Sequence, residues 1–297
     1  MQKRNASTRI PSDVPVPLKD TSPELAYRLA LAADAGRERG VGYRLYWLSA
    51  TDFANYDVPV DPDAFLVVGR HDKCDVVIEG DPTVALRHLL VRAQLLDDGC
   101  PRLSVLDLST DIGFQVAGGP SERSISATGP IAFRVGAFAM VALPQGEPAP
   151  PTLPEPTCSR ADAAHPYREP GVPAAITFLP RALELGESSD LAATGPGFTL
   201  GLRGAHGTAL VHLSPQDLET GVLVGRAPKC RDDVKAVLHE GISRVHLLLR
   251  RGQAYDLAST QGTYVGHQRV RSVRLEDAGT DIRIGKEDPI FLSWCRR

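Results

Sequence analysis

Cysteine is scarce in this sequence, and the way it is placed argues against two kinds of cysteine-based site. The 297-residue chain has five cysteines, an odd number, and no two of them form a Cys-x-x-Cys pair. A disulfide framework and a zinc site built on closely spaced thiolates are therefore both poorly supported. Isolated cysteines are most often small buried hydrophobic residues in a reducing compartment, and this is the role we predict for Cys74 and Cys230.

Long apolar runs are also missing. No stretch approaches 18 consecutive apolar residues, which excludes a transmembrane helix and membrane insertion. The first 23 residues carry six charges and no apolar segment of signal-peptide length. We therefore expect a cytoplasmic protein.

Neither charge nor aromatic content favours a nucleic-acid-binding protein. The formal net charge is −3 and aromatic residues make up 6% of the chain. A uniformly basic protein is thereby excluded. Single-stranded nucleic acid needs aromatic platforms on a basic face. The aromatic residues of the basic C-terminal part lie mostly in apolar, strand-like contexts; they are Phe198, Tyr255, Tyr264, Phe291 and Trp294. We therefore expect no nucleic-acid partner.

Motifs of catalysis and cofactor binding are missing too. His239, Glu240 and His246 do not have the spacing of an HExxH metalloprotease. Gly195-Pro196-Gly197 lacks the context of a dinucleotide-binding fold, and there is no P-loop. The eight histidines are scattered, with no Ser-His-Asp or Cys-His pattern. We expect no enzymatic activity, no metal and no cofactor.

Proline and strand-length apolar runs define the domain organisation. Residues 41–144 and 197–297 consist of short apolar runs separated by turn residues, which predicts an all-β protein with two sandwiches of short antiparallel strands. Residues 145–196 are rich in proline and predict an extended linker, with a strand as an alternative at 176–179. Residues 1–40 predict a tail with a short helix. This helix would have Ser22 as its N-cap and Pro23 as its first residue, with Leu25, Leu29 and Ala32 at helical spacing.

The two predicted sandwiches repeat each other. Matching positions recur in the same order, which indicates duplication of one domain rather than a short-period solenoid. The matched segments are 61–70 with 217–226, Lys73-Cys74 with Lys229-Cys230, His88 with His246, Asp107-Leu108 with Asp256-Leu257, and Gly113 with Gly262.

Three polar segments of the second copy form a candidate binding site. They are Gly225-Arg226, Ser243-Arg244-Val245-His246 and the segment 259–266, which begins Ser-Thr-Gln-Gly-Thr. Each follows an apolar run, where a strand meets a loop, and sandwich loops cluster at the ends of the sheets. Guanidinium and hydroxyl donors gathered there suit a phosphate monoester, with its charge of about −1.5 to −2 and three acceptor oxygens.

This pattern resembles the forkhead-associated (FHA) domain, a β-sandwich that binds phosphothreonine peptides. The resemblance covers roughly residues 197–297. It implies that Arg226 and Ser243 contact the phosphate, that Arg244 contacts phosphate or peptide, and that Thr260 assists the phosphate or the peptide backbone. It further implies a supporting role for His246 and tight turns at Gly225, Gly262 and Gly266. The family usually has Asn where this chain has Gln261, so peptide affinity or register could differ.

The first copy resembles the same fold with a damaged site. Arg70 and His88 remain, but the other positions have changed. Ala85 stands for Ser243, Leu86 for Arg244, Asp111 for Thr260, Ile112 for Gln261 and Phe114 for Thr263. A carboxylate would repel a phosphate at close range. Residues 197–297 have 15 Lys and Arg against 11 Asp and Glu (+4), whereas residues 41–144 have 8 against 13 (−5). We therefore predict that only the second copy reads phosphate.

The resemblance implies a non-enzymatic signalling or scaffold protein that binds a phosphothreonine-containing partner. The first copy would be a phosphate-independent interaction module. The partner could also be this chain itself, phosphorylated by a Ser/Thr kinase at Thr8, Thr21, Thr152 or Thr157 and bound in cis or by another copy. An alternative is a structural assembly protein that uses both sandwiches for contacts that need no phosphate.

Overall fold

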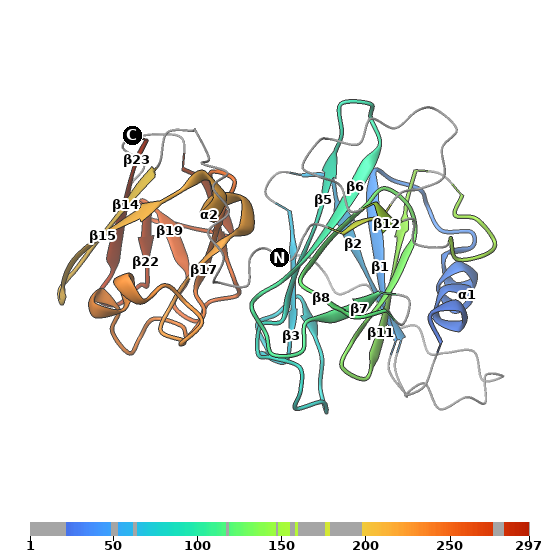
Figure 1. The fold of residues 1–297 in the computed structure, drawn as a ribbon, viewed down its shortest axis with the longest axis horizontal. Coiled ribbons are helices and arrows are strands. Elements are labelled where there is room, and N and C mark those ends of the chain that lie inside the picture. The colour runs from blue at the N-terminus through green and yellow to red at the C-terminus, as the bar shows by residue number, and fades with distance from the viewer. Residues whose placement is uncertain are drawn as a thin grey trace. The chain divides into compact units, whose positions relative to one another are not determined.

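The computed structural model describes residues 22–48, 53–61, 64–116, 119–146, 148–154, 158–159, 176–178, 198–275 and 282–296. The chain divides into two compact units, one made mainly of residues up to 184 and the other mainly of residues 185–297. In both units most of the regular secondary structure consists of short β-strands (Figure 1). The predicted all-β class, with a short N-terminal helix, is confirmed.

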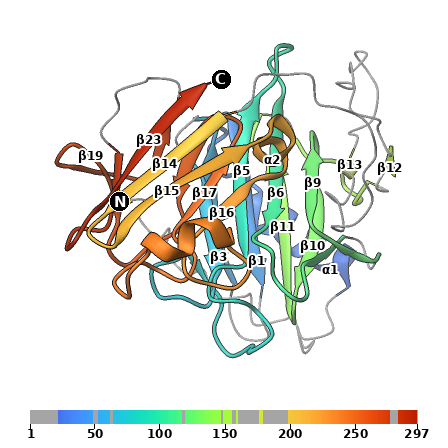
Figure 2. The same ribbon diagram turned by 60° about the vertical axis from the view of Figure 1, so that its left-hand side comes forward.

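The second unit is a sandwich of a six-stranded and a four-stranded sheet. The six-stranded sheet has the order β15 (Gly207–Leu213), β14 (Phe198–Gly204), β23 (Ile290–Arg296), β22 (Ile282–Ile284), β19 (Thr263–Val265) and β20 (Gln268–Val270). Figure 2 shows β14, β15 and β23 running side by side. The four-stranded sheet has the order β16 (Val222–Val224), β17 (Leu247–Arg250), β18 (Gln253–Asp256) and β21 (Ser272–Arg274).

The apolar residues of these strands meet between the two sheets. Leu200 and Leu292 contribute from the six-stranded sheet, and Val224 and Leu247 from the four-stranded one. Two short helical segments, α2 (Pro215–Thr220) and the 3₁₀ helix η2 (Asp232–Val237), complete the unit. Ser214 caps α2 in a capping box with Asp217, which explains why the chain turns there between β15 and β16.

The first unit is a sandwich of a six-stranded and a seven-stranded sheet. The six-stranded sheet has the order β2 (Phe53–Pro59), β1 (Gly42–Leu48), β11 (Phe138–Pro144), β10 (Ile131–Val135), β7 (Phe114–Val116) and β8 (Ser121–Glu122). The other has the order β12 (Cys158–Ser159), β13 (Ile176–Phe178), β9 (Ser124–Ala127), β6 (Pro101–Asp107), β5 (Leu89–Leu95), β3 (Leu66–Gly69) and β4 (Val76–Val77). The six-stranded sheets of the two units have equivalent strand orders, as duplication requires.

The N-terminal helix α1 (Pro23–Asp34) covers the outer face of the six-stranded sheet of the first unit (Figure 1). Ser22 accepts a hydrogen bond from the Leu25 N–H at 3.3 Å, and Pro23 begins the helix, as predicted. The buried face of the helix differs from the predicted one. Ala32 is exposed, whereas Ala26, Tyr27 and Ala30 are fully buried against the sheet.

Much of the predicted linker lies outside the described residues. Within it, β13 pairs antiparallel with β9, and β12 pairs parallel with β13, so these segments extend a sheet of the first unit. Residues 148–154 also belong to this unit, because Tyr27 Oη donates a hydrogen bond to the Pro150 carbonyl at 2.8 Å. Of the four candidate phosphorylation sites only Thr152 is described, and it is exposed. Thr8, Thr21 and Thr157 lie outside the described residues. In the part of the chain that the structure describes, no helix is both long and apolar enough to cross a membrane.

Candidate functional site

The three polar segments of the second unit come together at one end of its sandwich. Backbone hydrogen bonds join Arg226 N to Ser243 O at 3.5 Å and Ala227 N to Arg244 O at 2.7 Å. The third segment is attached through a side chain, because Thr260 N donates to Ser243 Oγ at 2.9 Å. Arg226, Ser243, Arg244 and Thr260 therefore lie on adjoining stretches of backbone, although up to 34 positions separate them in the sequence.

Gly225 makes this close approach possible. A Cβ atom at this position would lie 2.5 Å from the Arg244 carbonyl oxygen and 2.9 Å from the Cα of Val245. No side chain fits in that space, because real Cβ atoms are not found so close to backbone. The glycine thus lets the end of β16 lie against the segment that presents Ser243 and Arg244.

The site presents hydrogen-bond donors with no carboxylate to neutralise them. The Nε of Arg226 donates a hydrogen bond to the Ile242 carbonyl at 2.6 Å. This bond orients the guanidinium and leaves its two terminal nitrogens available to a ligand. Arg226, Arg244 and Thr260 are exposed. Within the described residues, no Asp or Glu forms an ion pair with either arginine. Ser243 is buried, and its Oγ accepts a hydrogen bond from Thr260 N, so its hydroxyl proton can still be donated.

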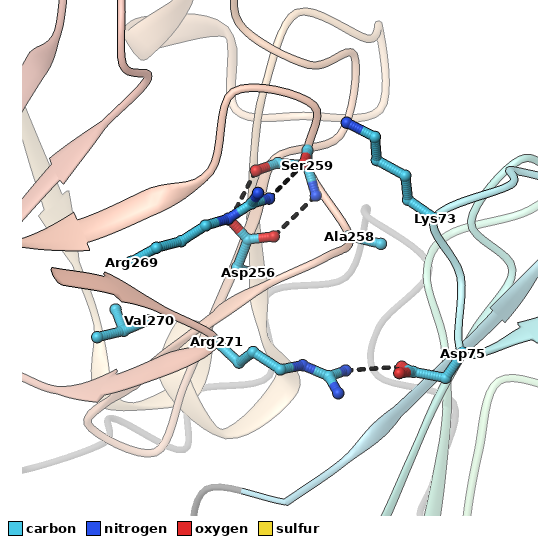
Figure 3. A pocket seen from close by; sticks show the side chains of 8 residues that line it. All are labelled: Lys73, Asp75, Asp256, Ala258, Ser259, Arg269, Val270 and Arg271. Carbon is cyan, nitrogen blue, oxygen red and sulfur yellow. Dashed lines mark hydrogen bonds and ion pairs between the residues drawn. The ribbon is translucent and has the colours of Figure 1, made fainter. Parts of the chain in front are cut away.

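A buried carboxylate holds the 259–262 turn in shape. Asp256 accepts hydrogen bonds from Ser259 N at 2.7 Å, from Ser259 Oγ at 2.6 Å and from Thr263 Oγ1 at 2.7 Å. Arg269 lies over the same turn, and its Nη2 donates to the Ser259 carbonyl at 3.0 Å (Figure 3). Because these bonds fix the residue directly before Thr260, the position of Thr260 is determined by the fold and not by a ligand.

His246 and Gly262 connect this turn to the segment that presents Ser243. His246 is fully buried, and its Nε2 lies 3.2 Å from the Gly262 carbonyl oxygen. Gly262 has φ +81°, and its N–H donates to Ser259 Oγ at 3.0 Å. Gly266 has φ +57° and forms the turn between β19 and β20. These three residues lie behind the presented donors.

Gln261 occupies the position beside Thr260 and is half-buried. Its Oε1 accepts a long hydrogen bond, 3.4 Å, from the Lys286 backbone N–H. Among the described residues, a peptide backbone that approached this amide would compete with that one weak bond, so the side chain can be recruited at little cost.

Cys230 supports the same backbone segment from the interior of the unit. It is buried, and its Sγ donates to the Arg244 carbonyl at 3.4 Å. Burial raises the pKa of the Cys230 thiol, although nearby Lys229 opposes the shift. The thiol therefore stays protonated near neutral pH and can keep donating to the Arg244 carbonyl.

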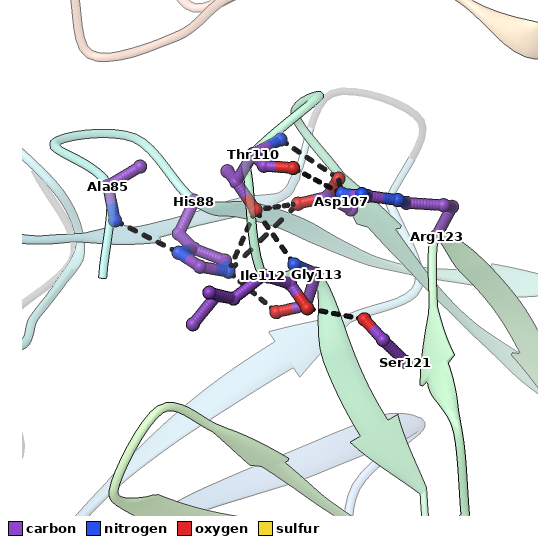
Figure 4. A network of polar contacts seen from close by, with 8 residues as sticks. All are labelled: Ala85, His88, Asp107, Thr110, Ile112, Gly113, Ser121 and Arg123. Carbon is purple, nitrogen blue, oxygen red and sulfur yellow. Dashed lines mark hydrogen bonds and ion pairs between the residues drawn. The ribbon is translucent and has the colours of Figure 1, made fainter. Parts of the chain in front are cut away.

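The first unit keeps the framework of this site and loses its donors. His88 Nε2 lies 2.7 Å from the Gly113 carbonyl oxygen, as His246 does from Gly262. Asp107 holds Thr110 as Asp256 holds Ser259, with Thr110 N donating to the carboxylate at 3.0 Å (Figure 4). Arg123 closes the network with a 2.7 Å ion pair to Asp107.

At the positions of the donors the first unit presents different chemistry. Arg70 keeps the orientation of Arg226, because its Nε donates to the Val84 carbonyl. Ala85 has no hydroxyl, and its N–H donates to His88 Nδ1 at 3.0 Å. Leu86 is 40% exposed and Asp111 is exposed. An apolar side chain and a carboxylate thus stand where the second unit has a guanidinium and a hydroxyl.

The sequence placed Ser259 and Thr263 in a polar segment of the candidate site without giving them a supporting role, and it did not assign Asp256 or Arg269 to the site. The repeat had matched Asp256 to Asp107 without assigning either a role. The signal was present in the spacing: an Asp followed three positions later by Ser or Thr occurs in both copies, and this pair closes a local side-chain-to-backbone turn.

Comparison with known proteins gives the following matches. The FHA domain family model matches residues 222–285, which span all three polar segments. No curated protein matches the chain in sequence. Among solved structures, the FHA domain of CT664 from Chlamydia trachomatis is 18% identical, with a TM-score of 0.29, covering 34% of this chain and 95% of that one. FHA-1 of Rv1747 from Mycobacterium tuberculosis is 18% identical, with a TM-score of 0.28, covering 35% and 98%.

A third solved structure contains a bound peptide. It is the FHA domain of yeast Dun1 in complex with a doubly phosphorylated peptide, 13% identical with a TM-score of 0.30, covering 45% of this chain and 93% of that one. The matched family model and the polar segments within it identify the second unit: this chain contains an FHA domain in its C-terminal half.

Proposed function

We propose that this protein is a phosphothreonine-peptide-binding signalling or scaffold protein, in which the second unit reads the phosphate. The main support is the cluster of Arg226, Ser243, Arg244 and Thr260, whose donors share one end of the sandwich without a carboxylate. In the proposed complex Arg226 and Ser243 bind the phosphate, Arg244 binds phosphate or peptide, and Thr260 and Gln261 hold the peptide backbone. Charge-assisted hydrogen bonds of this kind are the strong ones.

The preformed framework supports this function further. His246, Asp256 and the glycines hold the donors in place before any ligand arrives. A site ordered in advance loses little conformational entropy on binding. Peptide binding requires no chemical step, so we propose a non-enzymatic role. We also propose that the protein acts in the cytoplasm.

The test is calorimetric titration of the full-length protein with a phosphothreonine peptide library and its unphosphorylated counterpart. Hydrogen bonds to charged groups contribute about 1.5–3 kcal/mol each. Arg226→Ala and Ser243→Ala should therefore each raise Kd by at least about tenfold. Arg70→Ala, the matched change in the first unit, should leave Kd unchanged. Equal binding of unphosphorylated peptides, or an unaltered Kd in Arg226→Ala, would refute the proposal.

We propose that the first unit is an interaction module that does not depend on phosphate. Ala85, Leu86 and Asp111 cannot replace the donors of the second unit, and Asp111 would repel the ligand. A partner that copurifies through this unit should survive phosphatase treatment. If both units retain their partners after phosphatase treatment, the result would instead favour a structural assembly protein.

The phosphorylated partner could be another protein or this chain itself. A Ser/Thr kinase acting on Thr152, which is exposed, or on the threonines outside the described residues would create an internal ligand. A ligand on the same chain can reach a millimolar effective concentration, so even weak binding would switch the protein. Mass spectrometry after kinase treatment tests this, and the absence of phosphothreonine in residues 1–40 and 145–196 would exclude it.

A further inference from the structure

A row of alternating basic and aromatic side chains crosses the outer face of the six-stranded sheet in the second unit. Strand register places one residue of each strand directly beside the next. In spatial order the row, which we name the arginine row, is Thr208, Arg203, Phe291, Arg283, Tyr264 and Arg269. Directly paired residues point to the same face of a sheet. Their neighbours Thr263 and Leu292 point to the interior, which puts the row on the outside.

The aromatic rings of the row hold the guanidinium groups. Arg203 lies over the Phe291 ring, with Cζ 5.9 Å from the centroid, and Arg283 lies over the Tyr264 ring at 5.1 Å. Such cation–π contacts orient an arginine without neutralising it. Since a guanidinium already lies over each ring, the rings act as supports for the arginines and are poor platforms for nucleic-acid bases.

No carboxylate balances this charge within the sheet. The six strands contain no Asp and no Glu. In the described part of the chain, none of Arg203, Arg283 and Arg269 has an ion-pair partner. Three cations on one face without counter-charges favour an anionic ligand.

The fold itself does not require this row, because the first unit has different residues at the equivalent positions of its own six-stranded sheet. The equivalent positions there, in the same spatial order, are Phe53, Leu48, Ala139, Arg134, Gln115 and Ser121. Phe53, Leu48 and Ala139 are apolar and pack under α1. One copy thus has an apolar face covered by a helix, whereas the other has three arginines at the equivalent face.

The arginine row begins at the proposed phosphate site. Tyr264 lies four residues after Thr260, and Arg269 donates to the Ser259 carbonyl at 3.0 Å. Neighbouring strands are about 4.8 Å apart, so the row from Arg269 to Arg203 spans roughly 19 Å. An extended peptide rising about 3.3 Å per residue covers that length in about six residues.

We propose that the arginine row binds an acidic run of about six residues in the same partner whose phosphothreonine occupies the proposed site. This inference rests on the proposed function and assigns its ligand: a phosphothreonine peptide flanked by Asp, Glu or further phosphorylated residues. The acidic run adds affinity through exposed ion pairs, which are individually weak and sensitive to salt.

The test compares three phosphothreonine peptides on full-length protein by calorimetry: a short one, the same peptide extended by six Glu, and the same peptide extended by a six-residue Gly-Ser run. The extension is placed at the N-terminus in one set and at the C-terminus in another. In one of the two sets the Glu extension should tighten binding about five- to tenfold at low salt, and 0.5 M NaCl should remove the gain. The Gly-Ser extension should change nothing.

The variant R203Q/R283Q should abolish the gain from Glu while leaving the affinity for the short peptide unchanged. R250Q/R274Q removes the same charge from the four-stranded sheet and should keep the gain. A Glu extension that adds nothing at either end, or a gain that survives in R203Q/R283Q, overturns the proposal. So does oligo-dT binding that R203Q/R283Q abolishes while the Glu extension adds nothing, because the row would then serve nucleic acid.

Failure of the proposed function would look different. In that case the short phosphopeptide would not bind wild-type protein, and Arg226→Ala would change nothing. An unphosphorylated peptide with the Glu run separates the two ideas. Weak binding that is lost in R203Q/R283Q would then support the row alone, and no binding would refute it.

Discussion

In each unit a single glycine allows two backbone segments of the site to lie in close contact. Gly225 and Gly69 both lie against a neighbouring backbone segment, where a Cβ would meet a carbonyl oxygen. Replacement by alanine forces that segment away. Overpacking of this kind costs about 1–3 kcal/mol.

We expect Gly225→Ala and Gly69→Ala to destabilise the second and the first unit respectively, by about 1–3 kcal/mol. Only Gly225→Ala should also weaken phosphopeptide binding, since only it displaces Ser243 and Arg244. The chain has two tryptophans, Trp47 in the first unit and Trp294 in the second. Urea unfolding of Trp47→Phe and Trp294→Phe backgrounds therefore reports each unit separately. Equal loss of peptide affinity in both glycine variants would contradict the assignment.

At the residue scale the sequence predicted the donors better than their supports. Arg226, Ser243 and Thr260 follow from a resemblance to a family pattern, and the structure places them side by side. Asp256 and Arg269 were not predicted as part of the site. Arg269 reaches Ser259 only because β19 and β20 form a hairpin, and no local sequence pattern encodes that contact.

At the scale of elements, helix α1 shows how sequence periodicity can find a helix and misjudge its buried face. Ser22 and Pro23 mark its start correctly. The predicted face of Leu25, Leu29 and Ala32 was wrong at Ala32, because the helix packs through Ala26, Tyr27 and Ala30. Ala26 and Ala30 have small side chains, so the helix can pack closely against the sheet. Apolar spacing alone does not record which side of a short, alanine-rich helix does so.

This packing leads to a prediction at the same scale. Ala30→Asp buries an unpaired carboxylate between α1 and the sheet, which costs several kcal/mol unless the helix detaches. We expect the Trp47 unfolding midpoint to fall sharply, while the Trp294 midpoint and phosphopeptide affinity stay unchanged. Ala32→Asp is the matched control on the exposed face and should cost less than about 0.5 kcal/mol. Similar midpoints for the two variants would show that α1 contributes little to the first unit.

For the whole molecule, the sequence predicted two sandwiches because strand-length apolar runs recur between turn residues in both halves of the chain. The arginine row could not be predicted from the sequence in this way. Its members come from six strands spread over residues 203–291, and only strand register brings them into one line. The sequence predicts strand-like contexts for Phe291 and Tyr264, and strand register then places both on the outer face beside arginines.

The proposed difference in function between the two copies has a cause that can be tested directly. The first unit retains Arg70, His88 and the Asp107–Thr110 turn, so its framework is intact (Figure 4). What it lacks are donors at four exposed or half-buried loop positions. If the proposed site depends on those donors alone, restoring them should restore binding.

The test variant is A85S/L86R/D111T/I112Q, made in the Arg226→Ala background so that the second unit is silent. Ser at 85 would accept a hydrogen bond from the residue 111 N–H, as Ser243 does from Thr260, and would direct its proton toward a phosphate. We expect measurable phosphothreonine-peptide binding in this variant and none in the same chain with Arg70→Ala added. The change removes one carboxylate and adds one guanidinium, so low salt should strengthen binding. No binding by a fully folded variant would mean that the acidic surroundings of the first unit, and not only its missing donors, prevent phosphate reading.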